Sequence, residues 1–179
     1  MRVIAGKAKG KVIKSPKNVS IRPTTDLIRG AIFSILESMD ADWSYVLEFY
    51  AGTGSLGIEA LSRGAGWVDL VEQNHKCCEV IRGNLKQTGL EDQAQVYCLS
   101  ASQAISHLDK RYGIVLMGPP YRERSVIDTL EKLTASSLVR KGSTIVVEHS
   151  HRVPLSHFYS DFQLVKERRH GDTLISVYQ

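Results

Sequence analysis

The feature that most constrains the fold is a glycine-rich segment between an apolar run and a helical pattern. Residues 45–50 are mostly apolar, and Gly52, Gly54 and Gly57 follow where a helical pattern over 55–63 begins. A short apolar run that ends in glycines is typical of a buried parallel strand. Glycines between a strand and a helix let a ligand approach the backbone closely. The segment therefore predicts an α/β fold with a nucleotide-type ligand at this turn.

The alternation of strand and helix continues along the chain. We expect strands at 67–72, 95–99, 113–117 and 144–148, and helices at 27–39, 102–108 and 126–133. A further helix is expected to be capped by Asn74 and to run to about Gln87. Thr24 or Thr25 can cap the first helix. Residues 162–167 and 173–178 predict a closing antiparallel hairpin. This pattern is typical of a doubly wound α/β sheet with helices on both faces.

The first 24 residues differ in charge from the rest of the chain. They hold seven basic residues and no acidic one, whereas the whole chain has a net charge of +4. Apolar pairs at 3–4 and 12–13, on either side of Gly6 and Gly10, predict a short hairpin with lysines at its turn. We expect a basic N-terminal hairpin arm at 1–22 and a larger domain at 23–179. The arm either holds a polyanion or only aids solubility.

Composition excludes several classes of protein. A chain of 179 residues with 42% hydrophobic and 23% charged residues is typical of a globular domain, not of a disordered, collagen-like or membrane protein. Three cysteines cannot build a disulfide framework, and no zinc-ligand spacing is present, so we predict no metal. No apolar segment follows Met1-Arg2, so we expect a reduced, cytoplasmic protein without a secretory signal.

Two carboxylates near the glycine turn indicate the ligand. Glu72 ends the second expected strand, 20 residues after Gly52, where a carboxylate can accept both ribose hydroxyl protons of an adenosine. Glu48 precedes Gly52 by four residues, and a carboxylate there would repel a pyrophosphate but attract the ammonium of a methionine moiety. The pair favours S-adenosyl-L-methionine over a dinucleotide. A tight turn beside a surface glutamate is the alternative without a ligand.

A second motif, Gly118-Pro119-Pro120-Tyr121, follows the strand expected at 113–117. Prolines donate no hydrogen bond, so they stop the sheet and fix the direction of the carbonyls before them. Tyr121 would present a flat ring at the carboxyl edge of the sheet, where ligands of such folds bind. A proline turn with a packed tyrosine is the alternative.

Together these motifs resemble a known family. The stretch LEFYAGTGSLGIEALSRGA at 47–65 and RPTTD at 22–26 are similar to the bacterial 16S rRNA guanine-N2 methyltransferases that act on the small ribosomal subunit. Residues 3–7, 119–121, 148–149 and 171–173 fit the family as well. The resemblance implies a class I methyltransferase fold over 23–179, S-adenosyl-L-methionine as cofactor, and rRNA as partner, either in the small subunit or in an assembly intermediate.

The resemblance also assigns roles to particular positions. The predicted catalytic residues are Gly118 and Pro119, whose carbonyls accept hydrogen bonds, with Pro120, and Tyr121, which stacks on a base. The predicted cofactor-binding residues are Glu48, Tyr50, Gly52, Thr53, Gly54, Gly57, Glu72, Gln73, Ser100 and Ala101. The predicted RNA-binding residues are Arg2, Lys7, Lys9, Lys11, Arg22 and Arg122; an exposed charged loop is the alternative for Arg122.

Two positions depart from the family pattern. The family motif has Asp or Asn directly before Pro-Pro-Tyr, where this chain has Gly118. The family also usually has Asp after the third strand, where this chain has Ser100. Three function classes therefore stay open. The first is an RNA methyltransferase acting on the guanine 2-amino group. The second is a catalytically impaired RNA-binding homologue, and the third is a nicotinamide-dependent oxidoreductase that uses the glycine turn.

Overall fold

The computed structural model describes residues 1–16, 19, 24–119 and 125–179. The helices are α1 (Asp26–Glu37), α2 (Ser55–Ser62), α3 (His75–Thr88), α4 (Ala101–His107) and α5 (Ser125–Thr134), with a 3-10 helix, η1, at Glu91–Gln93. The strands are β1 (Tyr45–Phe49), β2 (Trp67–Val71), β3 (Ala94–Tyr97), β4 (Ile114–Met117), β5 (Thr144–Ser150), β6 (Phe158–Tyr159), β7 (Phe162–His170) and β8 (Thr173–Tyr178).

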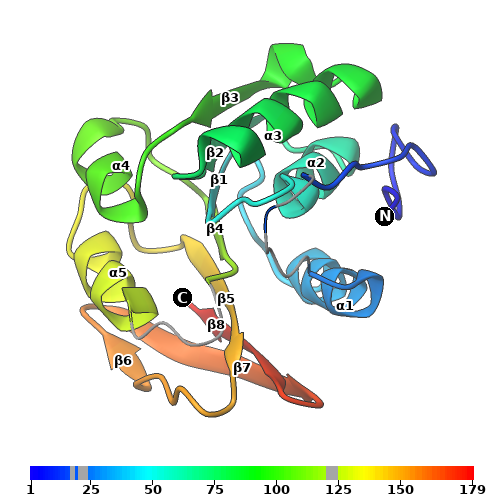
Figure 1. Cartoon of the computed structure of the whole chain (residues 1–179). Helices are drawn as coiled ribbons and strands as arrows, with labels where there is room; N and C mark the ends of the chain where they lie inside the picture. The colour runs from blue at the N-terminus through cyan, green and yellow to red at the C-terminus, as the bar shows by residue number, and fades with distance from the viewer. Residues whose placement is uncertain (17–18, 20–23, 120–124) are drawn as a thin grey trace.

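Within the described residues the strands form one eight-stranded sheet with the order β3-β2-β1-β4-β5-β8-β7-β6. Strands β1 to β5 run parallel, and β8, β7 and β6 continue the sheet with antiparallel pairs. Helices α1, α2 and α3 cover one face and α4 and α5 the other, so that a hydrophobic core lies on each side of the sheet (Figure 1). The doubly wound α/β prediction, with its C-terminal antiparallel hairpin, is confirmed.

The register of the parallel strands brings their carboxyl ends to one edge. Phe49 of β1 pairs with Val71 of β2 and with Met117 of β4. Val71 also pairs with Tyr97 of β3, and Met117 pairs with Val147 of β5. The residues that follow these strands therefore meet at the edge where α/β sheets bind ligands.

The helices begin and end where local chemistry satisfies their backbone groups. Thr25 caps α1, because its hydroxyl accepts the N–H of Ile28. Asn74 caps α3 in the same way, and Gly89 ends that helix with φ 69°, a left-handed conformation that glycine adopts without steric cost. The cap expected at Asn74 is thus confirmed, and the helix ends one residue beyond the expected end at Gln87.

Two differences from expectation concern the C-terminal part of the sheet. Strands β5 and β7 extend to Ser150 and His170, beyond the expected ends at 148 and 167. The two-residue strand β6 was not expected from the sequence, because two residues cannot display an alternating pattern.

The N-terminal hairpin is present and packs tightly on the domain. Arg2 and Val12 form an antiparallel bridge, and Val3, Ala8 and Ile13 are buried in the same core as α1, α2 and α3. Figure 1 shows this segment, in dark blue, beside α2 and α3. The hairpin is therefore part of the hydrophobic core; the domain boundary expected at residue 22 lies outside the described residues.

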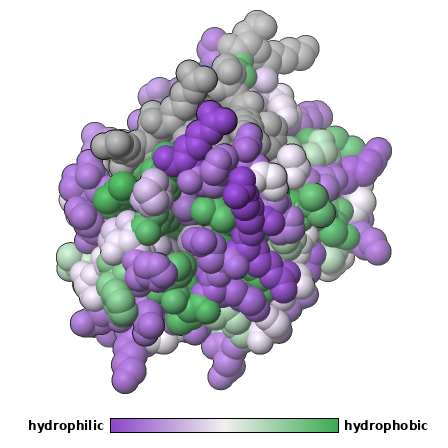
Figure 2. Space-filling model, turned by 90° about the horizontal axis from the view of Figure 1, so that it is seen from below, coloured by the Kyte–Doolittle hydropathy of each residue, from purple (hydrophilic) through white to green (hydrophobic). Residues whose placement is uncertain are grey.

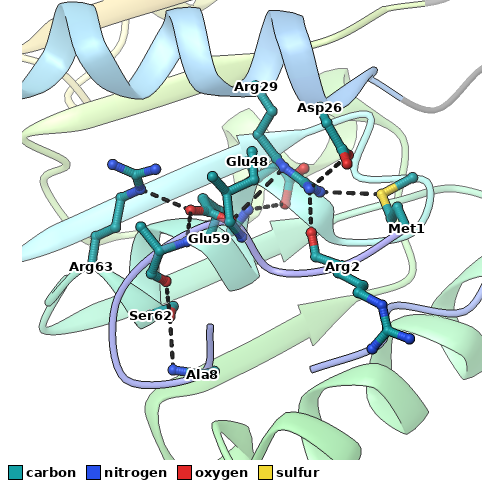
Figure 3. A network of polar contacts seen from close by, with 12 residues as sticks. Met1, Arg2, Ala8, Asp26, Arg29, Glu48, Glu59, Ser62 and Arg63 are labelled. Carbon is teal, nitrogen blue, oxygen red and sulfur yellow. Dashed lines mark hydrogen bonds and ion pairs between the residues drawn. The ribbon is translucent and has the colours of Figure 1, made fainter. Parts of the chain in front are cut away.

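Glu59 of α2 fastens the hairpin to the domain (Figure 3). Its two carboxylate oxygens accept the backbone N–H groups of Ile4 and Ala5 at 2.8 and 3.0 Å. One turn further along, the Ser62 hydroxyl accepts the N–H of Ala8 at 2.9 Å. These bonds satisfy backbone donors of the hairpin that are partly or fully buried.

The described helices include none long and apolar enough to cross a membrane. Seen from below in Figure 2, hydrophobic side chains lie in small groups between hydrophilic ones. The large hydrophobic residues exposed on the described surface are Leu27, Tyr45, Phe158 and Val165. Single exposed residues of this kind are ordinary at protein surfaces.

Candidate functional site

The chain turns sharply between β1 and α2. Tyr50, Gly52 and Gly54 have φ values of 58°, 54° and 74°, all in the left-handed region that glycine adopts freely. Tyr50 lacks that freedom, and its hydroxyl lies 2.8 Å from the Thr129 hydroxyl of α5. The glycine turn, residues 50–54, thus holds its backbone at the carboxyl edge of the sheet by local conformation and by this side-chain contact.

Gly57 lets α2 pack closely on the sheet. A Cβ at this position would lie 2.8 Å from Glu48 Oε2 and 2.9 Å from a methyl carbon of Leu70, so a larger residue would force these side chains or the helix to shift. The Gly57 N–H donates to the same Glu48 oxygen at 2.9 Å. Gly57 therefore supports the turn through packing.

Glu48 is buried beneath the glycine turn, with 2% of its surface exposed. Burial raises the pKa of its carboxyl to about 8, although the backbone N–H groups of Gly57 and Leu56 favour the ionised form. The carboxyl group is therefore mostly protonated at neutral pH. Its position joins the turn to β1.

Glu72 follows β2 and faces the glycine turn. Its Oε2 accepts the N–H of Gly52 at 2.9 Å, and its Oε1 accepts the N–H of Asn74 at 2.8 Å. The residue is partly exposed, and Gln73 beside it is exposed. A carboxylate oxygen has two lone-pair directions, so Glu72 keeps acceptor capacity for hydroxyl groups of a ligand while these two bonds fix its orientation.

An amide side chain that sequence reasoning missed connects the hairpin to the turn. Asn84 of α3 donates to the carbonyls of Lys14 and Thr53 at 2.9 and 3.0 Å, and accepts the Lys14 N–H at 2.9 Å. Asn84 is 1% exposed and Thr53 3%. An amide on the buried face of an amphipathic helix is the sequence signal that could have pointed to it.

Ser100 follows β3 and begins α4. Its hydroxyl accepts the N–H of Gln103 at 3.3 Å, and the Gln103 side chain accepts the Ser100 N–H at 3.0 Å. This reciprocal arrangement is a capping box, and Ala101 is the first residue of the helix. Both residues lie at the same edge as Glu72, as the sequence predicts.

The second motif begins at the end of β4. Gly118 is partly exposed and Pro119 is buried. On the neighbouring strand β5, Glu148 Oε2 accepts the Thr24 hydroxyl at 2.6 Å, which brings the residues just before α1 to this edge. Pro120, Tyr121 and Arg122, together with Arg22, lie outside the described residues.

The predicted RNA-binding side chains of the hairpin do not lie at the glycine turn. Lys11 Nζ donates to the carbonyl of Thr88, the last residue of α3, at 2.7 Å, and Lys7 Nζ donates to Gln93, which directly precedes β3. Arg2 donates to Gly10 at 2.8 Å, and Lys9 is exposed. The lysine turn, residues 7–11, therefore lies at the amino edge of the sheet, while Lys14 lies near the glycine turn.

Comparison with known proteins decides the family. The family described as "Conserved hypothetical protein 95" matches residues 1–179. The chain belongs to this family. This confirms the resemblance drawn from the sequence, because family relatives carry rRNA methyltransferase names.

Three relatives show how far the similarity extends. YlbH of Bacillus subtilis (strain 168), provisionally named an rRNA methyltransferase, is 32% identical over 100% of this chain and 98% of its own length. Ribosomal RNA small subunit methyltransferase D of Escherichia coli (strain K12) is 28% identical over 100% of this chain and 89% of its own length. The solved structure of yhhF from Escherichia coli, provisionally titled a methyltransferase, has a TM-score of 0.83 at 28% identity and covers 100% of this chain and 97% of that one.

The comparisons and the sheet order together establish a class I methyltransferase fold. At its carboxyl edge the structure gathers the glycine turn, Glu72, Ser100, Gly118 and Glu148 from five successive parallel strands. Glu48 and Gly57 lie beneath this edge. The arrangement offers carboxylate and carbonyl acceptors to a ligand seated across the strand ends.

Proposed function

We propose that the protein transfers a methyl group from S-adenosyl-L-methionine to the exocyclic 2-amino group of a guanine in 16S rRNA. The observation that carries the proposal is the bond from Gly52 N–H to Glu72, which fixes a partly exposed carboxylate over the glycine turn. Membership of a family whose relatives are named small-subunit rRNA methyltransferases supports the rRNA substrate.

The residues at the glycine turn suit an adenosyl donor better than a dinucleotide. Glu72 would accept the ribose hydroxyls, and Ser100 with Ala101 would lie toward the adenine. Glu48 would receive the methionine ammonium after losing its proton. Within the described part of the chain neither glutamate forms an ion pair. The Glu72 carboxylate beside the turn disfavours a pyrophosphate, and Glu48 adds to this once it has lost its proton.

The remaining cofactor positions act through backbone and surroundings. Tyr50, Gly52, Thr53 and Gly54 would present the turn to the donor, Gly57 would hold α2 in place beneath it, and Gln73 would flank the ribose. The donor supplies an electrophilic methyl group when bound. Every other step depends on how the chain holds the target base.

The protein's task at the guanine is to position a poor nucleophile. The lone pair of the 2-amino nitrogen is delocalised into the ring, so acceptors that hold its two hydrogens help to expose the nitrogen to the methyl group. We assign this role to the carbonyls of Gly118 and Pro119, with Pro120 fixing their direction and Tyr121 stacking on the base. Placement and electrostatics then supply most of the rate.

The test is transfer of a tritiated methyl group to small-subunit rRNA, offered both as naked RNA and in assembled small subunits. We expect that the nucleotides released from this rRNA by nuclease digestion carry the label on the 2-amino group of guanine. Absence of label from both substrates would contradict the proposal and favour the catalytically impaired RNA-binding homologue. That alternative rests on Gly118, which stands where the family motif has Asp or Asn.

Isothermal titration separates the methyltransferase from the oxidoreductase. The wild-type protein is expected to bind S-adenosyl-L-methionine and not NAD, and Glu72→Ala is expected to lose donor binding because its ribose acceptor is gone. The matched control is Glu79→Ala, an exposed carboxylate of α3. Binding of NAD alone would overturn the cofactor assignment.

A further inference from the structure

A second carboxylate lies beside the motif that begins at Gly118. Met117 of β4 pairs with Val147 of β5, so Gly118 and Glu148 are neighbours at the carboxyl ends of adjacent parallel strands. A Cβ built on Gly118 would lie 3.8 Å from Glu148 Oε2 and 3.9 Å from Thr24 Oγ1. Glu148 and Thr24 therefore border the space into which a side chain of residue 118 would extend.

Glu148 is held in this position. The Thr24 hydroxyl donates to its Oε2 at 2.6 Å, and only 7% of the residue is exposed. Thr24 is itself placed by the start of α1, where Thr25 caps the helix. A buried carboxylate with a fixed orientation loses little freedom when it accepts a further hydrogen bond, which is the condition for preorganised electrostatic stabilisation.

The backbone does not require glycine at position 118. Its φ lies outside the left-handed region, and the atoms nearest to a Cβ at this position would be at ordinary van der Waals distance. A side chain could therefore be accommodated. The side-chain acceptor that the family motif carries at this position is absent here, yet a carboxylate reaches the same space from the next strand.

We propose that Glu148 is the side-chain acceptor for one of the two hydrogens of the guanine 2-amino group and takes that proton, while the carbonyls of Gly118 and Pro119 hold the other hydrogen. This rests on the proposed function. The nitrogen forms a bond to the methyl carbon as the methyl–sulfur bond of the sulfonium donor breaks, and that electron pair stays on sulfur. The nitrogen then gives one proton to the Glu148 carboxylate, which passes it to water. The products are N2-methylguanine, the neutral thioether and one proton.

The first experiment measures single-turnover methylation of small-subunit rRNA. Glu148→Gln keeps the shape and an oxygen for Thr24 but cannot take the proton, so we expect the rate to fall about a hundredfold, with donor affinity by titration within twofold of wild type. The matched control is Glu131→Gln, an exposed carboxylate of α5, which should leave the rate unchanged.

Introducing the absent side chain makes the assignment specific. Gly118→Asp should give no gain in the wild-type background, where Glu148 already acts. In Glu148→Ala the same Gly118→Asp change should restore the rate at least tenfold, whereas Gly118→Ala should not. Wild-type rates in Glu148→Gln, or a large gain from Gly118→Asp alone, would overturn the proposal.

A binding measurement separates this inference from the proposed function. Inosine 5′-monophosphate differs from guanosine 5′-monophosphate only in lacking the 2-amino group. Wild-type protein should bind the guanosine nucleotide more tightly, and Glu148→Ala should reduce that preference toward one. If rRNA is not methylated but this preference depends on Glu148, the acceptor role of Glu148 is supported and the proposed methyltransferase function is contradicted. Equal binding of both nucleotides by the wild type, including no binding of either, would overturn the acceptor role.

Discussion

Arg29 and Glu59 face each other with fully buried side chains, and Arg29 Nε lies 3.8 Å from Glu59 Oε2 (Figure 3). Burial lowers the pKa of Arg29, while the charge of Glu59 opposes that change. Arg29 also donates to the Arg2 carbonyl and to Asp26. The pair thus joins α1, α2 and the N-terminal hairpin in one charged cluster.

Removing Glu59 should destabilise the protein severely. Glu59→Ala removes the buried carboxylate beside the Arg29 guanidinium and leaves two hairpin N–H groups without acceptors, which should cost about 3–5 kcal/mol of unfolding free energy. Urea denaturation measures this. The control is Glu37→Ala, whose more exposed carboxylate contacts the same Arg63 that Glu59 contacts; it should cost about 1 kcal/mol or less. Equal costs for the two variants would contradict the role given to Glu59.

Glu48 should make stability depend on pH. The unfolded chain ionises this carboxyl above its ordinary pKa of 4.5, whereas the folded pKa is about 8. The contribution of a protonated Glu48 to the stability of the fold is therefore fully present below about pH 4.5, and it is lost as the pH rises through 8. Glu48→Gln should be more stable than wild type at pH 8, by an advantage that grows by up to about 1.4 kcal/mol for each pH unit in this window.

Urea midpoints at pH 5 and pH 8 test this prediction. Glu79→Gln, an exposed carboxylate of α3 for which the same charge is removed, should follow the wild-type pH profile. Parallel profiles for Glu48→Gln and wild type would show that the carboxyl ionises normally in the folded protein.

Ser100 joins a helix cap to the proposed adenine subsite. Ser100→Ala removes the hydroxyl that accepts the Gln103 N–H and should cost about 1 kcal/mol. Ser100→Asp keeps a capping oxygen and adds a charged acceptor, so stability should be retained and affinity for S-adenosyl-L-methionine should rise about tenfold. Thermal melting and titration measure the two effects. An equal gain from Ser102→Asp, two residues into the helix, would attribute the change to charge alone.

The lysine turn should contribute to the salt dependence of RNA binding. Deleting the hairpin would also remove Val3, Ala8 and Ile13 from the core, so substitution is the cleaner test. Lys7→Gln/Lys9→Gln/Lys11→Gln should lower the slope of log affinity against log salt by about 2, at roughly 0.7 for each lost phosphate contact with single-stranded RNA.

The control for this measurement removes three charges from β7, in Lys166→Gln/Arg168→Gln/Arg169→Gln. Its slope should stay near that of wild type. If the β7 variant changes the slope as much as the lysine variant does, the effect follows net charge and not a contact at the lysine turn.

The sequence was most informative where local chemistry decides the structure. The C-terminal strand at 173–178 has the expected bounds. Asn74 and Gly89 mark the two ends of α3, because the identity of a single residue determines a helix cap. The spacing of Glu72 from Gly52 predicted a carboxylate near the glycine turn, but it did not predict the hydrogen bond between these two residues. The burial of charged residues could not be predicted, because nothing in the sequence near Arg29 or Glu59 shows that α1, α2 and the hairpin meet at these residues.

The same limit applies to the basic residues. Their charge is visible in the sequence, but the edge of the sheet at which they lie depends on where the hairpin packs, and that is set by Glu59 and Ser62 across more than 50 positions. Glu148 and Thr24 likewise meet only because β5 neighbours β4 and α1 begins beside both. Contacts between distant segments follow from the assembled fold.

The separation of the lysine turn from the glycine turn has a consequence for how the protein discriminates among RNAs. Helix α2, with 8 residues, spans about 12 Å between the two edges. A mononucleotide can contact only the lysine turn or only the glycine turn, whereas a large folded RNA can reach both and gain the avidity of two linked contacts. Selection by molecular size would then precede any recognition of the individual base.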